Sequence, residues 1–297
     1  IYTYQEAVTP LPAYMKKIKY DTITKENLNV TDDLTRDKVI NYLYGYTYDA
    51  NASHEPTGVR EWCLWSIVHS RPVVIDYYDP SDISKLQKRY VAVGANDGML
   101  HVFDDTDPDP TDDSIEPTGE EIFAFVPPDL LPKLKLLSTD PFVDTVDGNI
   151  TLYRSNKQPK YLIFGLRAGG GSFWCLDISD QDPSNWSVKW TFTHSEIVQS
   201  WSAPAIATIP DTLDTTTGER TFKDVVFFTG GYDPEEDNYP EPFSDGDDDG
   251  EPDFPSEWKS NNNNQDVNGN NKYDYYNPGT NEYGRGIFAV EIDDATN

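Results

Sequence analysis

Short apolar runs that end at Gly, Pro, Asn or Asp recur along the chain from about residue 60. They are rich in β-branched and aromatic residues, and their length is that of a strand rather than a helix. One pair is separated by Asn96-Asp97-Gly98, whose residues tolerate the positive φ of a tight turn. The pattern predicts strands at residues 73–77, 89–94, 99–103, 121–126, 150–153, 161–165, 172–177, 188–192, 203–207, 225–230 and 286–292.

These strands form a repeat. In each unit an apolar strand ends at a glycine, and an aromatic strand that ends in an acid follows it. The glycines are Gly94, Gly165 and Gly230, and the acids are Asp104, Asp177 and Glu291. Two units open with Ser-x-Pro, at residues 70–72 and 202–204. A repeated four-stranded unit is typical of propeller blades, whereas a β-sandwich needs no internal repeat.

The predicted fold class is therefore all-β: a β-propeller of four-stranded antiparallel blades, at about residues 59–135, 149–193 and 201–297. The third blade has only three strands in this sequence. A closed propeller needs about four blades or more, so we expect an incomplete propeller of about three blades from a longer polypeptide. The chain begins at Ile1 rather than Met, which is consistent with removal of an upstream segment.

Residues 1–58 form a lead-in segment with a different pattern. Apolar residues at 34, 39, 40 and 43 have nearly helical spacing, Asp32 or Asp33 can cap the start, and Gly45 can end the run. We predict a short helix near residues 34–44. The stretch before it is expected to be irregular.

The charge excludes some classes of partner. The chain carries 23 Lys and Arg against 52 Asp and Glu, a formal net charge of −29. Nucleic-acid binding needs a basic face, and an anionic membrane surface would repel such a chain. No apolar run approaches the roughly 18 residues that span a bilayer. The 37% of hydrophobic residues are nevertheless enough for a packed core.

A long acidic insertion, residues 231–285, separates the last two predicted strands. Two nine-residue runs within it place oxygen-bearing side chains at alternate positions, the spacing with which a tight loop surrounds Ca²⁺. Position 7 would contribute its backbone carbonyl. The candidate ligands are Asp245, Asp247, Asp249, Glu251 and Asp253 in the first run, and Asp266, Asn268, Asn270, Lys272 and Asp274 in the second.

Neither run completes an EF-hand, because Ser256 and Asn277 stand where the bidentate Glu would be. A solvated acidic loop is the alternative, and Asn261-Asn262-Asn263-Asn264 between the runs supports it. We expect at least one calcium site, since a divalent ion offsets the mutual repulsion of these carboxylates.

Other candidate chemistry is weak. CxxC, HExxH and Gly-x-Ser-x-Gly motifs are absent, and the glycine-rich residues 165–172 lack the Lys of a phosphate loop, so they are expected to form a turn. The histidines show no metal-binding spacing. The seven tryptophans could stack sugars but more often pack between blades. Cys63 and Cys175 either form a disulfide in an exported protein or remain separate buried thiols. We predict no catalytic residue.

Several segments resemble one known family. Arg60-Glu61-Trp62 and the string Gly94-Ala95-Asn96-Asp97-Gly98-Met99-Leu100-His101 are the most specific. Residues 39–45, 67–74, 121–127, 146–148, 169–170 and 176–178 extend the likeness. Together they resemble the propeller of PilY/PilC-type proteins, the adhesins of type IV pilus tips. Residues 64–67 depart from that family's usual Leu-Gly-Asp-Ile, and the family's large N-terminal region and later blades are missing.

The resemblance implies a propeller akin to those of quinoprotein dehydrogenases that serves adhesion and pilus biogenesis, including control of extension and retraction, without catalysis. It implies a calcium loop that maps onto the two acidic runs. The implied partners are minor pilins of the pilus tip complex and a host or abiotic surface, with no nucleic acid and no membrane insertion. The implied location is the cell surface or pilus tip, reached through the periplasm. The rival interpretations are a structural subunit of an extracellular assembly whose propeller other segments complete, and a quinone-dependent dehydrogenase.

Overall fold

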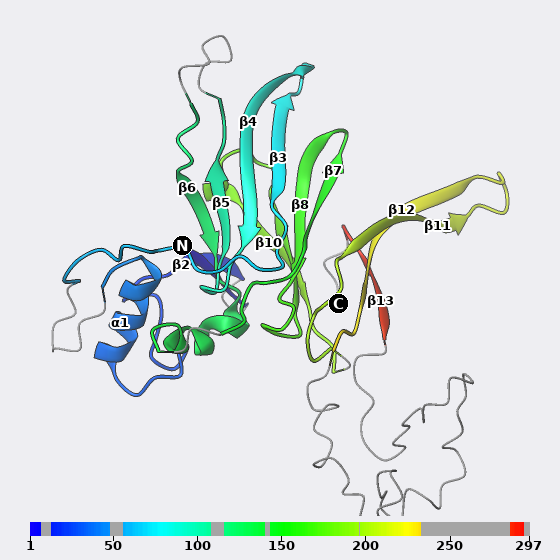
Figure 1. The fold of residues 1–297 in the computed structure, drawn as a ribbon. Coiled ribbons are helices and arrows are strands. Elements are labelled where there is room, and N and C mark those ends of the chain that lie inside the picture. The colour runs from blue at the N-terminus through cyan, green and yellow to red at the C-terminus, as the bar shows by residue number, and fades with distance from the viewer. Residues whose placement is uncertain are drawn as a thin grey trace, which may run out of the picture.

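The computed structural model describes residues 1–6, 13–47, 56–107, 116–139, 143–195, 197–232 and 286–293. Within them the chain forms three sheets that stand side by side (Figure 1). In each sheet, strands that follow one another in sequence pair antiparallel.

The first blade consists of β3 (Val73–Asp79), β4 (Asp82–Gly94), β5 (Leu100–Asp104) and β6 (Glu121–Phe125). The second consists of β7 (Ile150–Ser155), β8 (Gln158–Gly165), β9 (Phe173–Asp177) and β10 (Ser187–Phe192). The third contains β11 (Ala205–Leu213), β12 (Arg220–Thr229) and β13 (Ile287–Glu291). Two 3₁₀ segments, Pro128–Leu136 and Pro183–Asn185, lie in connections. The predicted all-β fold of antiparallel propeller-type blades is confirmed, and the described sheets do not close into a ring.

The lead-in segment is more ordered than its sequence indicates. Helix α1 (Asp33–Leu43) begins where predicted, and the Asp32 side chain caps it by accepting the backbone N–H of Thr35 at 2.8 Å. The expectation of an irregular stretch before the helix is wrong, because β1 (Tyr2–Gln5) and β2 (Tyr14–Lys17) form a ribbon there.

Strand β1 runs parallel to β6 and extends the first sheet to six strands. Tertiary contacts hold it in place, since the Tyr2 ring stacks on Phe123 at 5.3 Å and the buried Thr3 hydroxyl donates to the carbonyl of Val126 at 2.7 Å. Because β1 has only four residues, these contacts are not reflected in an alternating pattern of apolar and polar residues in the sequence.

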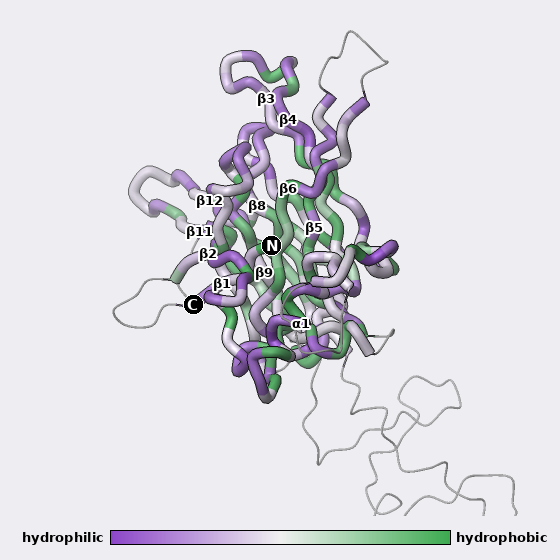
Figure 2. The backbone as a smooth tube through the Cα atoms, turned by 90° about the vertical axis from the view of Figure 1, so that its left-hand side faces the viewer, coloured by the Kyte–Doolittle hydropathy of each residue, from purple (hydrophilic) through white to green (hydrophobic). Residues whose placement is uncertain are grey.

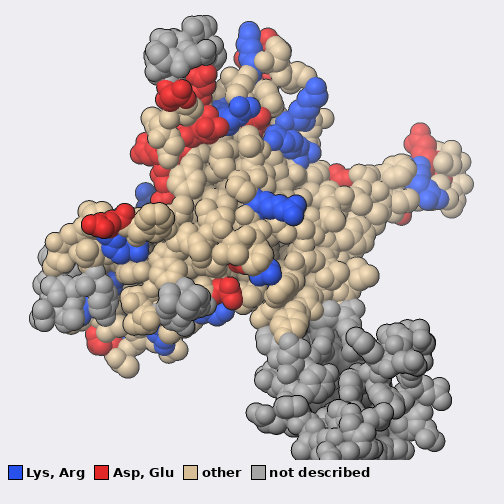
Figure 3. All heavy atoms as spheres, in the orientation of Figure 1, with Lys and Arg blue, Asp and Glu red and all other residues tan. Residues whose placement is uncertain are grey.

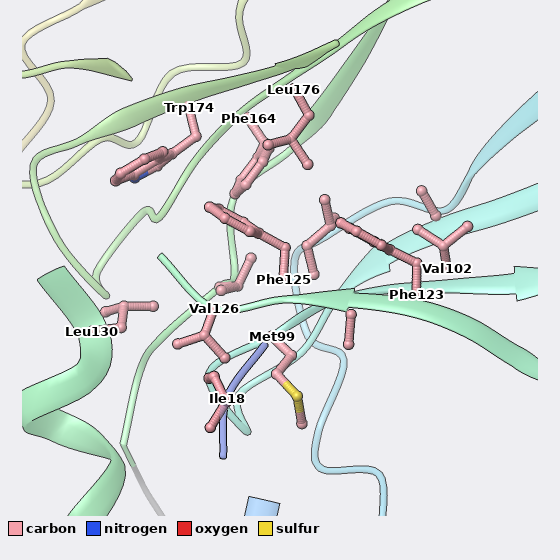
Figure 4. Close-up of a cluster of buried hydrophobic side chains, with 14 of the residues drawn as sticks. Ile18, Met99, Val102, Phe123, Phe125, Val126, Leu130, Phe164, Trp174 and Leu176 are labelled. Atoms are coloured by element: carbon pink, nitrogen blue, oxygen red, sulfur yellow. The ribbon is translucent and has the colours of Figure 1, made fainter. Parts of the chain in front are cut away.

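The middle sheet buries both of its faces. In β9, Trp174 and Leu176 belong to the core shared with the first sheet, while Phe173 and Cys175 belong to the core shared with the third. Figure 4 shows the first of these cores, in which Phe125 lies against Phe164 and Trp174. Each fully buried large apolar side chain contributes roughly 1.5–3 kcal/mol, so sheet-on-sheet contact holds the array together.

Two views show how polarity and charge are distributed. Apolar residues concentrate where the sheets face one another, and the tip of the β3–β4 hairpin is polar (Figure 2). On the face drawn in Figure 3, acidic side chains gather at the upper left, in the region of β5 and β6, whereas Lys and Arg spread over the middle. The described part of the chain is therefore not uniformly acidic.

The free edge of β3 is covered by side chains of the neighbouring blade. The Arg154 guanidinium donates to the carbonyls of Val74 and Asp76 at 3.0 and 3.2 Å. The Gln158 amide donates to the carbonyl of Tyr78 at 2.9 Å and accepts its N–H at 3.1 Å. These bonds occupy edge groups that would otherwise be available to another strand.

Candidate functional site

Loops that join the second strand of each blade to the third lie at one end of the sheets, opposite the β3–β4 and β7–β8 hairpin tips that point upward in Figure 1. They contact the segments that open the next blade. The Gly98 N–H donates to the Thr145 hydroxyl at 3.0 Å, and the Ser200 N–H donates to the Gly170 carbonyl at 2.9 Å. This loop face therefore connects all three blades.

The root of the long insertion belongs to the same face. The Gly230 N–H donates to the carbonyl of Gly286 at 2.8 Å, which holds the end of β12 beside the start of β13. Gly231 has φ +78°, and a Cβ there would lie 1.7 Å from the carbonyl oxygen of Gln199. Only glycine fits this close approach.

The Asn-Asp-Gly turn of the first blade is a buried connector. The Asn96 side chain donates to the Ser66 hydroxyl at 3.1 Å and accepts the Thr145 N–H at 3.1 Å. Asp97 accepts the N–H of Met99 at 3.2 Å. The most distinctive string of the sequence thus joins the segment before β3 to the segment before β7, and it is not an exposed recognition motif.

His101 lies between two carboxylates and is only 3% exposed. Its Nε2 is 2.9 Å from Oδ1 of Asp97, and its Nδ1 contacts Oε1 of Glu121. Both partners accept hydrogen bonds when ionised, so the arrangement requires a proton on each ring nitrogen. Burial alone would lower the pKa of His101, but the two carboxylates outweigh it and raise the pKa to about 9. His101 is therefore a structural cation at neutral pH.

The Ser-x-Pro openings have a specific structural role. The Ser70 hydroxyl accepts the N–H of Gly94 at 2.9 Å, and the Ser202 hydroxyl accepts the N–H of Thr229 at 2.9 Å. Each serine stands three residues before the first strand of its blade and fastens the end of the second strand.

Asp147 occupies the equivalent position of the second blade but makes different bonds. It is 2% exposed and accepts the His69 N–H at 2.9 Å, the His69 ring Nδ1–H at 2.5 Å and Nη1 of Arg167 at 3.1 Å. In the second blade the Asp147 carboxylate thus stands where the other blades have serine, and it holds the His69 imidazole and the Arg167 guanidinium in place. Sequence reasoning missed both Asp147 and Arg167; aligning the blade openings would have shown that Asp147 breaks the repeat.

Arg167 is held on its other side by an aromatic ring. Its guanidinium carbon lies 3.8 Å from the centroid of the Trp201 ring. The Trp201 Nε1–H donates to the side-chain oxygen of Gln199 at 2.6 Å, and Tyr232 meets the indole edge-on at 5.7 Å. A chain of contacts therefore runs from His69 through Asp147 and Arg167 to Trp201, across the openings of all three blades.

The ten predicted calcium-ligand residues, from Asp245 to Asp274, lie outside the described residues. Within the ranges given above, no group of three or more His, Cys, Asp or Glu side chains is placed to hold a metal ion. The same part of the chain contains no helix long and apolar enough to cross a membrane.

The two cysteines are not bonded to each other. Cys63 is exposed in the segment that precedes β3, whereas Cys175 is buried in β9, where burial raises the pKa of its thiol. Of the two alternatives, separate thiols are correct, although only Cys175 is buried: β9 points this side chain into the core between the second and third sheets.

Part of this sequence is similar to that of known proteins. No family model matches the chain. A type IV pilus biogenesis factor PilY1 homologue of Xylella fastidiosa is 36% identical over 130 residues, which cover 41% of this chain and 10% of that protein. PilY1 of Pseudomonas aeruginosa is 30% identical over 187 residues, which cover 54% of this chain and 15% of that protein. The chain thus spans a small fraction of these relatives.

A solved structure, the C-terminal domain of Pseudomonas aeruginosa PilY1, is 28% identical over 49% of this chain and 26% of its own, with a TM-score of 0.31. The chain's own topology defines the class of protein: an array of antiparallel, propeller-type blades, two with four strands and a third with three described strands. Its sequence identifies it further as a homologue of the PilY1 type IV pilus biogenesis factors, which confirms the resemblance seen in the sequence.

Proposed function

We propose that this chain is a non-catalytic propeller module of a type IV pilus biogenesis factor that acts in pilus assembly and adhesion at the cell surface. The observation that carries the proposal is the sequence identity with two PilY1 proteins, in a chain that folds into repeated blades. The proposed partners are minor pilins of the tip complex and a host or abiotic surface.

A hybrid protein tests the assembly role. The segment of Pseudomonas aeruginosa PilY1 that matches this chain is replaced by the whole chain, including the lead-in segment whose β1 pairs with β6, and the hybrid is expressed in a strain that lacks PilY1. We expect surface pili to be restored, measured by shearing the cells and immunoblotting the major pilin. A hybrid that is produced at the normal level and exported but restores no pili would contradict the proposal.

We further propose that the insertion binds Ca²⁺ through the acidic runs Asp245–Asp253 and Asp266–Asp274. Their oxygen-bearing side chains at positions 1, 3, 5 and 9 support this assignment. The insertion leaves the loop face beside the Trp201–Tyr232 pair, so ordering it by calcium would change the surface offered to a partner.

Thermal unfolding of the full chain in EDTA, Ca²⁺ and Mg²⁺ tests the calcium site. One native-only site at 100 times its Kd adds about 2.7 kcal/mol, which corresponds to about 5 °C in Tm for a chain of this size. We expect a rise with millimolar Ca²⁺ that Asp253→Ala or Asp274→Ala abolishes. Glu61→Ala, an exposed acid outside the insertion, is the control. Equal Tm in EDTA and Ca²⁺ would refute the site.

A further inference from the structure

Among the described tryptophans, three are buried, Trp65 is half-buried and two are exposed. Trp174, Trp186 and Trp190 are at most 6% exposed and pack between the sheets, as expected for propeller blades. Trp62 and Trp201 are 79% and 40% exposed. A large aromatic ring at the surface is available for contact with a ligand, and the two exposed tryptophans differ in how they are held.

Trp201 is preorganised on the loop face. The guanidinium carbon of Arg167 lies 3.8 Å from the centroid of the Trp201 ring. The Trp201 Nε1–H donates to Gln199, and the Tyr232 ring meets the indole edge-on. Little side-chain entropy remains to be lost when a ligand stacks on a ring fixed in this way. Trp62 makes no ring, cation or hydrogen-bond contact of this kind with the described residues, so it provides an internal control.

Arg167 occupies its position against the preference of its backbone. It has φ +55°, in the left-handed region, within a loop that also contains Gly169, Gly170 and Gly171. Glycine adopts this conformation freely, whereas a residue with a Cβ adopts it less readily. The Arg167 side chain that this backbone carries joins Asp147 to the Trp201 ring.

Asp147 also fixes the tautomer of His69. Because the carboxylate only accepts hydrogen bonds, Nδ1 of His69 carries a proton. In the Nδ1–H tautomer the other ring nitrogen, Nε2, is a hydrogen-bond acceptor, and the His69 side chain is 45% exposed. The exposed Val68 lies beside it in sequence. The loop face thus offers a hydrogen-bond acceptor, an aromatic ring and an apolar flank.

We propose that Trp201, His69 and Arg167 form a binding site for the end of a neutral glycan. The apolar C–H face of a pyranose ring stacks on the indole, a sugar hydroxyl donates to Nε2 of His69, and the remaining guanidinium N–H groups of Arg167 donate to ring or hydroxyl oxygens. Successive contacts of 2.5, 3.1 and 3.8 Å connect His69 to Trp201 through Asp147 and Arg167, so the three side chains belong to one continuous surface cluster. The proposal extends the adhesion part of the proposed function.

The charge balance of the site favours a neutral ligand over a charged one. Asp147 balances the charge of Arg167 within the site, so no net positive charge remains for a carboxylate or a phosphate. The whole chain carries −29 and repels acidic sugars and nucleotides.

Saturation-transfer NMR and titration of the full chain test the site with methyl β-D-glucopyranoside, methyl β-D-galactopyranoside and N-acetyl-D-glucosamine. N-acetylneuraminic acid is the acidic comparison, and a polyproline peptide represents the other class of ligand that stacks on aromatic rings. We expect at least one neutral sugar to bind, with Trp201→Ala and His69→Gln weakening it about tenfold or more and Trp62→Ala leaving it unchanged.

Circular dichroism and Tm of each variant distinguish loss of the site from loss of the fold, and Trp201→Phe, which keeps a ring, should retain part of the binding. The proposal is overturned if no neutral sugar binds, if Trp62→Ala weakens binding as much as Trp201→Ala, or if only the acidic sugar or the peptide binds. None of these results would affect restoration of pili by the hybrid, so the two proposals fail separately.

Discussion

Replacing His101 with Gln should remove a pH-dependent part of the stability. His101 is protonated between Asp97 and Glu121 in the folded chain, and its pKa is raised from the ordinary 6.5 to about 9. A raised pKa means that the contribution is complete below pH 6.5 and is lost as the pH rises through 9. Each pH unit between the two values corresponds to about 1.4 kcal/mol, so the full effect is roughly 3 kcal/mol. Glu121 is 41% exposed, which makes this figure an upper value.

Urea unfolding of the wild type and of His101→Gln between pH 6.5 and 9.5 measures this contribution. This range lies above the titration of ordinary carboxylates, and subtracting the two curves cancels groups that titrate in both proteins. We expect the advantage of the wild type to shrink by up to roughly 3 kcal/mol as the pH rises. Val59→Ala, which changes an exposed residue without a titratable group, should run parallel to the wild type.

A constant difference between wild type and His101→Gln across this range would refute the reasoning. It would mean that the imidazole is neutral in the fold and that one of its carboxylate partners holds the shared proton instead. A stability difference that shrinks as the pH falls would also refute the reasoning, because it would mean that the fold lowers the pKa of His101 instead of raising it.

Two further variants test the packing, and one labelling experiment tests the thiols. Phe228→Ala should cost about 3–5 kcal/mol in urea unfolding, because the ring stacks on Phe173 at 4.0 Å between the second and third blades; a loss below 1 kcal/mol would contradict that core. Gly169→Ala should destabilise by several kcal/mol, since its Cβ would lie 1.8 Å from a backbone carbonyl oxygen. Alkylation of the native chain should label Cys63 and spare Cys175, and mass spectrometry showing both labelled at equal rates would disprove the burial of the second thiol.

The blade strands were predictable because their physical signal is local. Strand β8 is buried on both faces, so residues 161–165 are continuously apolar, and a glycine marks the close approach where the strand ends. The Asn96-Asp97-Gly98 turn was predictable for a similar reason, since its conformation restricts the residues that can form it.

Features that depend on distant partners were not predictable. The β1 strand is stabilised by Thr3 and Tyr2 contacts with residues more than a hundred positions away. The site at Asp147 depends on side chains from three blade openings, and its acid interrupts the Ser-x-Pro pattern that would have marked the position. The calcium runs stay a prediction, because their spacing can be read from the sequence but their coordination depends on a loop outside the described residues.

The hydrogen bond between Gly230 and Gly286 has a consequence for how this module can change. Because this bond joins the two ends of the insertion, β12 and β13 pair in the same register whatever the connecting segment contains. The entropy of closing such a loop grows with the logarithm of its length, so doubling it costs only about 0.6 kcal/mol. The blade can therefore exchange one insertion for another of different length and composition, and so acquire a new surface specificity without rebuilding its core.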